Sequence, residues 1–134
     1  RKLILKGILD ADDAKIAANS GADALVVSNH GGRQLDGAPS TISALPAIVD
    51  AVEDEMEVLV DGGIRSGQDV LKAVASGARG VLAGRAPVYG LGAGGEAGVL
   101  KSLELIRNEL DLTMAFCGHT DVTQVDEGIL LRSD

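Results

Sequence analysis

VLVDGGIRSG, residues 58–67, joins a short apolar run to a glycine-rich turn at the start of a predicted helix. Similar pairs recur along the chain. The predicted strands are Leu3–Leu5, Ala24–Val27, Val58–Val60 and Val81–Ala83, and the predicted helices are Asp12–Asn19, Ile42–Val52, Gly67–Ser76 and Glu96–Leu112. This alternation is typical of an α/β fold in which a crossover helix follows every strand of a parallel sheet. The apolar stripe of the last helix, at Val99, Leu103, Ile106 and Leu110, is expected to lie on that sheet.

An internal repeat supports this architecture. A shift of about 56 residues superposes Gly7-Ile8 on Gly63-Ile64 and Ser20-Gly21-Ala22 on Ser76-Gly77-Ala78. Each copy therefore holds two βα pairs, and polar candidates follow its strands. Four strands with helices outside leave one sheet face and both edges uncovered. Half of an eight-stranded barrel and an open doubly wound sheet both remain possible, and we favour the half-barrel.

Composition excludes several classes of protein. The 134 residues carry 12 Lys and Arg against 20 Asp and Glu, a net charge of −8, and the basic residues are scattered, which argues against a nucleic-acid surface. The single cysteine, Cys117, favours a reducing, intracellular setting. Apolar runs are too short to span a bilayer, and residues 1–3 do not resemble a signal peptide. We expect an intracellular, cytoplasmic protein.

Two glycine-rich strand ends predict a phosphate site. Gly62 and Gly63 precede one helix, and Gly84 follows the next strand. Glycine lets the backbone approach an anion, and a helix N-terminus supplies free N–H groups. Arg65 and Arg85 add positive charge beside the two turns. The alternative is a plain turn, but its double occurrence favours phosphate binding.

SNHGGRQLDG, residues 28–37, is the sharper candidate, in an unusually long loop. His30 follows a buried strand and can act as a base near pH 7, while Arg33 can hold a carboxylate through two hydrogen bonds. The alternatives are a hydrogen-bonded histidine and a solvated arginine. Lys6 ends the first predicted strand, where it could stabilise developing negative charge or simply extend to solvent.

Two further signals are weak. The pattern GxGxxG at Gly90–Gly95 is separated from the preceding strand, so a dinucleotide site is not expected there. His119 lies in a polar stretch and is expected at the surface. No spacing of histidine, cysteine or carboxylate residues indicates a metal site.

SNHGGRQLDG, together with LKG at residues 5–7 and GRAPVYGL at residues 84–91, resembles the FMN-dependent 2-hydroxy acid dehydrogenases and oxidases. This resemblance implies oxidation of a small L-2-hydroxy acid, of the lactate, glycolate or mandelate type, to the 2-oxo acid. His30 would be the base and Arg33 would hold the substrate carboxylate. It leaves open whether hydride transfer or a carbanion is the route. The implied FMN contacts are Lys6 and Ser28 at the flavin ring, and Asp61, Gly62, Gly63, Ile64, Arg65, Gly84 and Arg85 along the ribityl phosphate.

Members of that family are longer than this chain. The resemblance implies that residues 1–134 are the C-terminal half of an FMN-binding (β/α)8 TIM barrel, incomplete without an N-terminal half that brings active-site tyrosines and the partner of His30. It also implies a homo-oligomer, a tetramer in many members, and leaves peripheral membrane association open. The alternatives are another phosphate-binding barrel, such as a nucleotide dehydrogenase, and a nonenzymatic phosphate-binding half-barrel.

Overall fold

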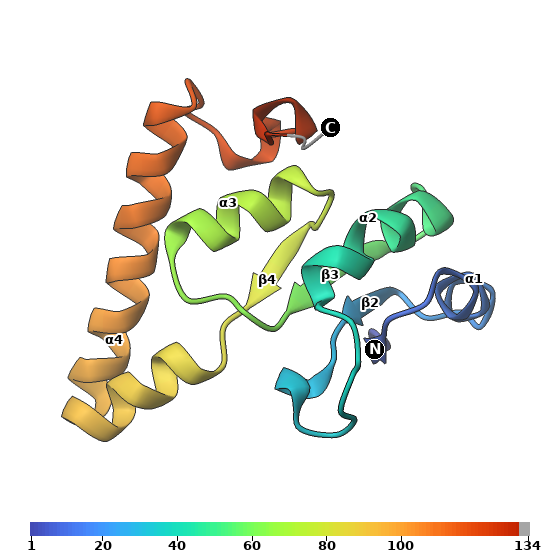
Figure 1. Ribbon diagram of the computed structural model, residues 1–134, viewed down its shortest axis with the longest axis horizontal. Helices are drawn as coiled ribbons and strands as arrows, with labels where there is room; N and C mark the ends of the chain where they lie inside the picture. Colours follow the sequence, from blue (N-terminus) through green and yellow to red (C-terminus); the bar gives the residue numbers. More distant parts are fainter. Residues whose placement is uncertain (132–134) are drawn as a thin grey trace.

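The computed structural model describes residues 1–131 as an α/β unit built on a four-stranded sheet (Figure 1). The strands are β1 (Ile4–Ile8), β2 (Ala24–Val27), β3 (Glu57–Asp61) and β4 (Gly80–Leu82), and the helices are α1 (Ala11–Asn19), α2 (Thr41–Val52), α3 (Gly67–Ala75) and α4 (Arg85–Phe116). Short 3-10 turns lie at His30–Gly32, Val122–Gln124 and Glu127–Ile129. The predicted alternation of strands and helices is therefore confirmed.

The strands are all parallel and lie side by side in sequence order, β1-β2-β3-β4. A doubly wound sheet reverses its strand order at a switch point, whereas a barrel adds each new strand on the same side. The order therefore favours a segment of a barrel over an open doubly wound sheet.

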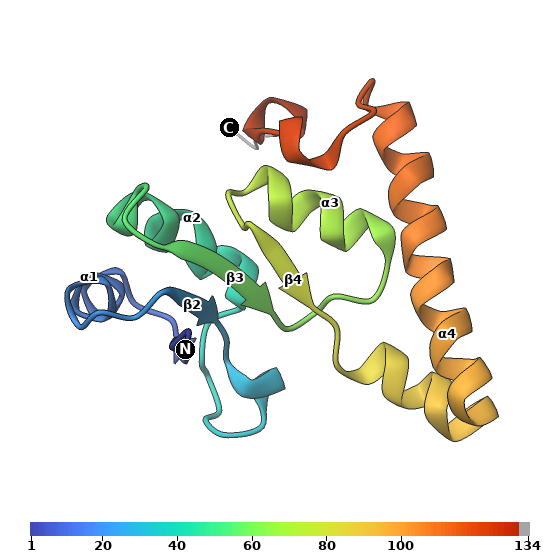
Figure 2. The ribbon, with the colours of Figure 1, turned by 180° about the vertical axis from the view of Figure 1, so that it is seen from behind.

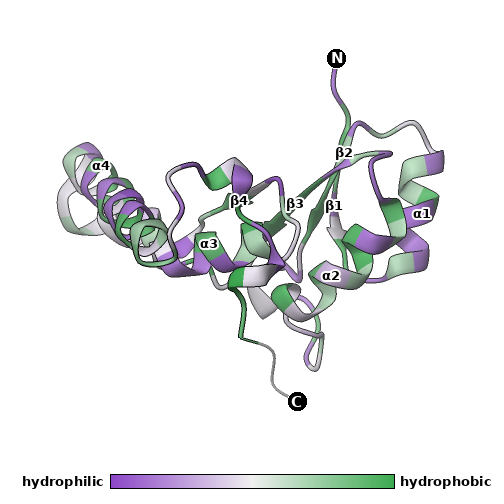
Figure 3. Cartoon of the chain, turned by 90° about the horizontal axis from the view of Figure 1, so that it is seen from above, coloured by the Kyte–Doolittle hydropathy of each residue, from purple (hydrophilic) through white to green (hydrophobic). Residues whose placement is uncertain are grey.

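One face of the sheet is covered and the other is open. Helices α1, α2 and α3 lie on the same face (Figure 3). There, buried side chains of β2 and β3 pack against those of α2; the core includes Leu25, Val27, Leu45, Ile48, Val52, Val58 and Val60. On the opposite face, Ile4 is 51% exposed and Leu82 is 41% exposed. Within residues 1–131, no strand pairs with the outer edge of β1 or β4. The open face and edges fit a barrel completed by other strands.

Strand β1 extends further than the sequence predicted. We expected it to end at Leu5, with Lys6 just beyond, but the strand runs to Ile8 and Lys6 lies in its middle. Gly7 has a φ of +107°, and the pairing with β2 shifts between Lys6 and Ile8. A glycine that resembles a strand break is thus a β-bulge, which interrupts the ladder for one residue and lets the strand continue.

Helix α4 contradicts the expected packing of the last helix. It is a hairpin of two helical segments, 85–93 and 96–116, that meet where Gly94 and Gly95 leave helical geometry. The longer segment packs against α3, with α3 between it and the sheet (Figure 2). The predicted stripe therefore faces a helix, not the sheet, and Leu103 is 46% exposed.

The contact between α3 and α4 is a close backbone approach. The N-terminal residue of α3, Gly67, donates its N–H to Glu109 Oε2 at 3.0 Å. A Cβ atom on Gly67 would overlap the α4 backbone at Ile106, Glu109 and Leu110. The φ of Gly67 is not in the left-handed region, so the backbone conformation does not require glycine here. The lack of space for a Cβ atom does. None of the helices within residues 1–131 combines the length and apolar character needed to cross a membrane.

We predict that Gly67→Ala lowers the free energy of unfolding by about 1–3 kcal/mol, the usual cost of forcing an extra methyl group into a packed contact. Gly92→Ala is the control, because a Cβ atom there meets no atom within 4 Å. Its effect on stability should be neutral or favourable by at most about 1 kcal/mol. Denaturant unfolding measures both, and equal losses in the two variants would contradict the packing argument.

Candidate active site

A cavity of about 1190 Å³ opens at the carboxyl ends of the strands. All the predicted site residues except Ser28 line it, namely Lys6, His30, Arg33, Asp61, Gly62, Gly63, Ile64, Arg65, Gly84 and Arg85. They come from strands β1 and β3, from the loops that follow β2, β3 and β4, and from the first residue of α4. The sequence prediction that these residues converge at one end of the sheet is confirmed.

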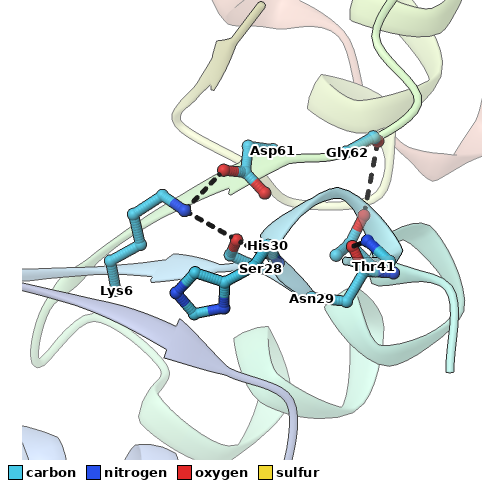
Figure 4. Close-up of polar contacts among 8 residues, drawn as sticks. Lys6, Ser28, Asn29, His30, Thr41, Asp61 and Gly62 are labelled. Carbon is cyan, nitrogen blue, oxygen red and sulfur yellow. Dashed lines mark hydrogen bonds and ion pairs between the residues drawn. The ribbon is translucent and has the colours of Figure 1, made fainter. Parts of the chain in front are cut away.

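Lys6, in the middle of β1, links that strand to the ends of β2 and β3 (Figure 4). Its Nζ donates to Ser28 Oγ at 2.9 Å and forms an ion pair with Asp61 Oδ2 at 2.8 Å. The Lys6 side chain is 41% exposed and that of Asp61 is 17% exposed. Ser28 and Asp61 thus hold the ammonium group of Lys6 at the cavity wall, which restricts the motion of this side chain in solvent.

Ser28 is fully buried below the cavity. Its Oγ accepts from Lys6 Nζ and from the backbone N–H of His30, the latter at 3.1 Å. The hydroxyl therefore connects the cation to the start of the His30 loop. Direct contact between Ser28 and a cofactor ring stays a prediction.

Asp61 has one carboxylate oxygen without a partner. Its Oδ1 is buried, and no donor reaches it from the residues that the structure describes, while Oδ2 faces Lys6. A buried acceptor without a hydrogen bond costs about 1–3 kcal/mol, so a donor from a ligand or from a neighbouring segment would stabilise this site.

The loop after β2 holds His30 in an unusual backbone conformation. Three consecutive residues have positive φ, with His30 at +55°, Gly31 at +72° and Gly32 at +71°. Non-glycine residues seldom adopt this region, and such strain collects at functional sites. Asn29 stabilises the turn, because its Oδ1 accepts from Gly32 N and its Nδ2 donates to Pro39 O, both at 3.2 Å.

The loop after β3 is tied to the same region by Thr41, the first residue of α2. The Thr41 hydroxyl is buried and donates to the carbonyl oxygen of Gly62 at 3.4 Å. Gly62 and Gly63 have φ values of +88° and +81°. A Cβ atom on Gly63 would meet nothing within 4 Å, so the loop leaves open space beside its backbone.

The two helix N-termini beside the cavity differ. In α3 the backbone N–H groups of Arg65 and Ser66 both donate to Asp69 Oδ2, and Gly67 N donates to α4. The sequence argument that this helix offers free N–H groups to an anion is therefore wrong at these three positions. The carboxylate of Asp69, which forms a capping box with Ser66, accepts from the first two of these N–H groups, and Glu109 accepts from the third.

Helix α4 begins without such a cap. Gly84 makes no side-chain capping bond, and a Cβ atom there would project into open space. The guanidinium group of Arg85 lies near the His30 loop, since a Cβ atom on Gly31 would be 3.7 Å from Arg85 Nη2. The start of α4, the cation of Arg85 and the Gly62-Gly63 turn thus lie on one side of the same cavity, and anion binding there stays a prediction.

Three residues that shape the site received no assigned role from the sequence. Asn29 and Thr41 support the two loops from below, and Tyr89 lines the cavity from α4. Tyr89 was missed because residues 85–93, which include Pro87, Gly90 and Gly92, were not predicted to be helical. The only sequence signal for Asn29 is its place inside SNHGGRQLDG, between Ser28 and His30. Nothing in the sequence distinguishes Thr41.

The glycine run at Gly90–Gly95 has a packing role. Gly90 and Gly98 lie where the two segments of α4 cross, and a Cβ atom on either would overlap the backbone of the other. The run follows the first turns of a helix, not a strand, as expected for a chance match to a dinucleotide pattern. His119 is half-buried, and its backbone N–H donates to Met114 O just beyond α4.

The chain is similar in sequence to a family of flavin enzymes. The family model of the FMN-dependent dehydrogenases matches residues 1–132. An L-lactate dehydrogenase of Caulobacter vibrioides (strain NA1000 / CB15N) is 59% identical over 128 residues, which cover 96% of this chain and 33% of that protein. An L-lactate dehydrogenase of Pseudomonas syringae pv. syringae (strain B728a) is 51% identical over 131 residues, or 98% of this chain and 34% of that protein.

Solved structures of mandelate oxidase variants are similar to the chain. One that carries a monooxide FMN adduct superposes with a TM-score of 0.88 at 53% identity, covering 90% of this chain and 38% of that one. Another, with (S)-mandelic acid, also has a TM-score of 0.88 at 53% identity and covers 90% of this chain and 36% of that one. The chain thus spans about a third of the length of the curated relatives it matches.

We predict that Thr41→Val loosens the loop after β3, because it removes the hydroxyl that donates to Gly62 O while keeping the side-chain shape. The unpaired carbonyl should lower the free energy of unfolding by about 1 kcal/mol. Thr41→Ser keeps the donor and serves as the control. Amide hydrogen exchange at residues 62 and 63 should accelerate in Thr41→Val alone, and identical exchange in the two variants would contradict this role.

Proposed function

The chain belongs to the FMN-dependent dehydrogenase family, and from this premise we propose that it supplies the FMN-binding and substrate-binding side of an enzyme that oxidises a small 2-hydroxy acid to the 2-oxo acid. One observation carries the proposal. A cation, a histidine and an arginine line the same cavity as the glycine turns suited to a phosphate. Family membership decides against the nucleotide dehydrogenase alternative. The nonenzymatic half-barrel is left to experiment.

The sheet is proposed to act as part of a closed barrel. Its inner face exposes Ile4 and Leu82, both edges are unpaired within residues 1–131, and the relatives are about three times as long. The remaining strands of such a barrel would cover this face and close the cavity. That these four strands form its C-terminal half stays a prediction.

The residues present fit FMN. The open positions at Gly63 and Gly84 allow the phosphate to approach the backbone, and Arg85 would balance its charge. A ribityl hydroxyl would supply the donor that Asp61 Oδ1 lacks. Lys6 would place positive charge at the flavin ring, at the position where Asp61 and Ser28 already hold its ammonium group.

Oxidation of the 2-hydroxy acid to the 2-oxo acid removes two electrons and two protons. When bound, FMN supplies the two-electron acceptor. Arg33 would hold the substrate carboxylate with paired N–H donors and so orient the carbon that is oxidised. An imidazole nitrogen of His30 would accept one proton from the substrate, and the Lys6 ammonium group would stabilise negative charge that develops nearby.

The substrate is proposed to be a hydroxy acid of the lactate or mandelate type. This choice rests on the similarity to proteins described as L-lactate dehydrogenase and mandelate oxidase. Among the described residues, Arg33 and His30 account for recognition of the carboxylate and hydroxyl groups that both substrates share. Choice between their side chains is assigned to the part of the barrel outside this chain.

We predict that His30→Gln and Arg33→Lys separate two roles. In the flavin-loaded full-length protein, His30→Gln should still bind FMN and the hydroxy acid, but reduction of the flavin by lactate or mandelate should slow by about 10²–10⁴-fold because the base is missing. Arg33→Lys keeps its charge but loses the paired geometry, so binding of the acid should weaken. Rapid mixing in single turnover follows bleaching of the flavin and reports both quantities.

His119→Gln is the matched control, since this histidine does not line the cavity and its change should leave flavin reduction unaltered. Near-normal reduction in His30→Gln would remove the base assignment. If the wild-type protein binds FMN and neither lactate nor mandelate reduces the flavin, the result would support the alternative of a nonenzymatic phosphate-binding half-barrel.

A further inference from the structure

We propose that Gly7 is a positioning residue for His30, because its missing side chain leaves the space in which the imidazole ring lies. The inference rests on the proposed function, in which His30 is the base. It concerns what holds that base in place, and its evidence is the packing of β1 against the loop after β2.

The contact is close. A Cβ atom on Gly7 would lie 2.8 Å from His30 Cε1, nearer than real Cβ contacts allow, and 3.7 Å from both Nδ1 and Nε2. Cε1 lies between the two nitrogens of the ring. The imidazole therefore approaches Gly7 with its Cε1 edge, and neither nitrogen is blocked by the backbone of β1.

Other restraints on the ring come from its own backbone. His30 has a φ of +55°, and its N–H is held by Ser28 Oγ at 3.1 Å. Within residues 1–131, no hydrogen bond from another side chain holds the imidazole. Figure 4 shows the ring reaching back over β1, beside Lys6. The position of the ring thus depends on the loop backbone and on the space above Gly7.

The β-bulge explains why this space exists. Pairing between β1 and β2 shifts between Lys6 and Ile8, so Gly7 is the residue outside the regular ladder. On one side of it, Lys6 faces the cavity, and on the other, Ile8 packs with the core. The bulge therefore places Lys6, which carries the cation, directly before Gly7, which leaves space for the imidazole ring.

Gly7 has two independent reasons to be glycine, and they can be separated. Its φ of +107° alone disfavours any side chain. Gly21 has a φ of +83°, but a Cβ atom there meets nothing within 4 Å. Gly21→Ala therefore reproduces the backbone strain without the contact, which makes it the matched control for Gly7→Ala.

The first test measures flavin reduction by lactate or mandelate in the flavin-loaded full-length protein. Gly7→Ala should slow the reduction step by about 10²-fold, the scale expected when a catalytic group is displaced by about 1 Å, while the affinity for the acid changes little. Gly21→Ala should leave the reduction rate unchanged. Normal reduction in Gly7→Ala, or equal slowing in both variants, would overturn the proposal.

The second test does not depend on the role of His30 in catalysis. The melting temperature should fall further in Gly7→Ala than in Gly21→Ala, and the excess should vanish when His30→Ala is added to Gly7→Ala. If Gly7→Ala alone fails to fold, recovery of folding in the double variant supports the contact. An equal loss with and without the imidazole, or a double variant that also fails to fold, would overturn it.

The two tests also separate this proposal from the proposed function. Normal flavin reduction in His30→Gln with an intact stability coupling to Gly7 would remove the base assignment and keep the positioning contact. Slow reduction in His30→Gln without that coupling would keep the base and reject Gly7 as the residue that positions it.

Discussion

The site depends on one interaction, the ammonium group of Lys6 held between Ser28 and Asp61. Parallel strands present their carboxyl ends at one edge of the sheet, where Ser28 follows β2 and Asp61 ends β3, and Lys6 reaches both from the middle of β1. A partly exposed ion pair adds about 1 kcal/mol or less to stability. Its main consequence is chemical, because it fixes a cation in the cavity wall and joins that cation to the backbone of His30 through Ser28.

Two loops with left-handed backbone geometry are built on this edge. One holds His30 and the other holds Gly62 and Gly63. Asn29 and Thr41 bind the loops from beneath, so neither depends on a ligand for its hydrogen bonds. The two loops proposed to bind substrate and phosphate are therefore held by their own hydrogen bonds without a ligand, which lowers the entropic cost of ordering them on binding.

Sequence patterns predicted the strands, the helix order and a set of site residues of which all but Ser28 line the cavity, because alternating apolar runs and strand-end motifs are local signals. Three features depend on contacts between distant residues. The bulge at Gly7 extends β1, and Glu109 of α4 accepts the backbone N–H of Gly67 at the start of α3. Glycines in residues 85–98 allow the two segments of α4 to cross closely. Because glycine usually ends a helix, the sequence did not predict a helix at residues 85–93.

The most direct test of this account is a crystal structure of the full-length protein purified with its flavin. We expect the FMN phosphate within hydrogen-bonding distance of the Gly63 and Gly84 backbone and of Arg85, a ribityl hydroxyl donating to Asp61, and Lys6 at the flavin ring. His30 should lie over Gly7 with a nitrogen facing the substrate position. A phosphate bound elsewhere, or an Asp61 carboxylate that contacts only Lys6 in the loaded protein, would contradict the account.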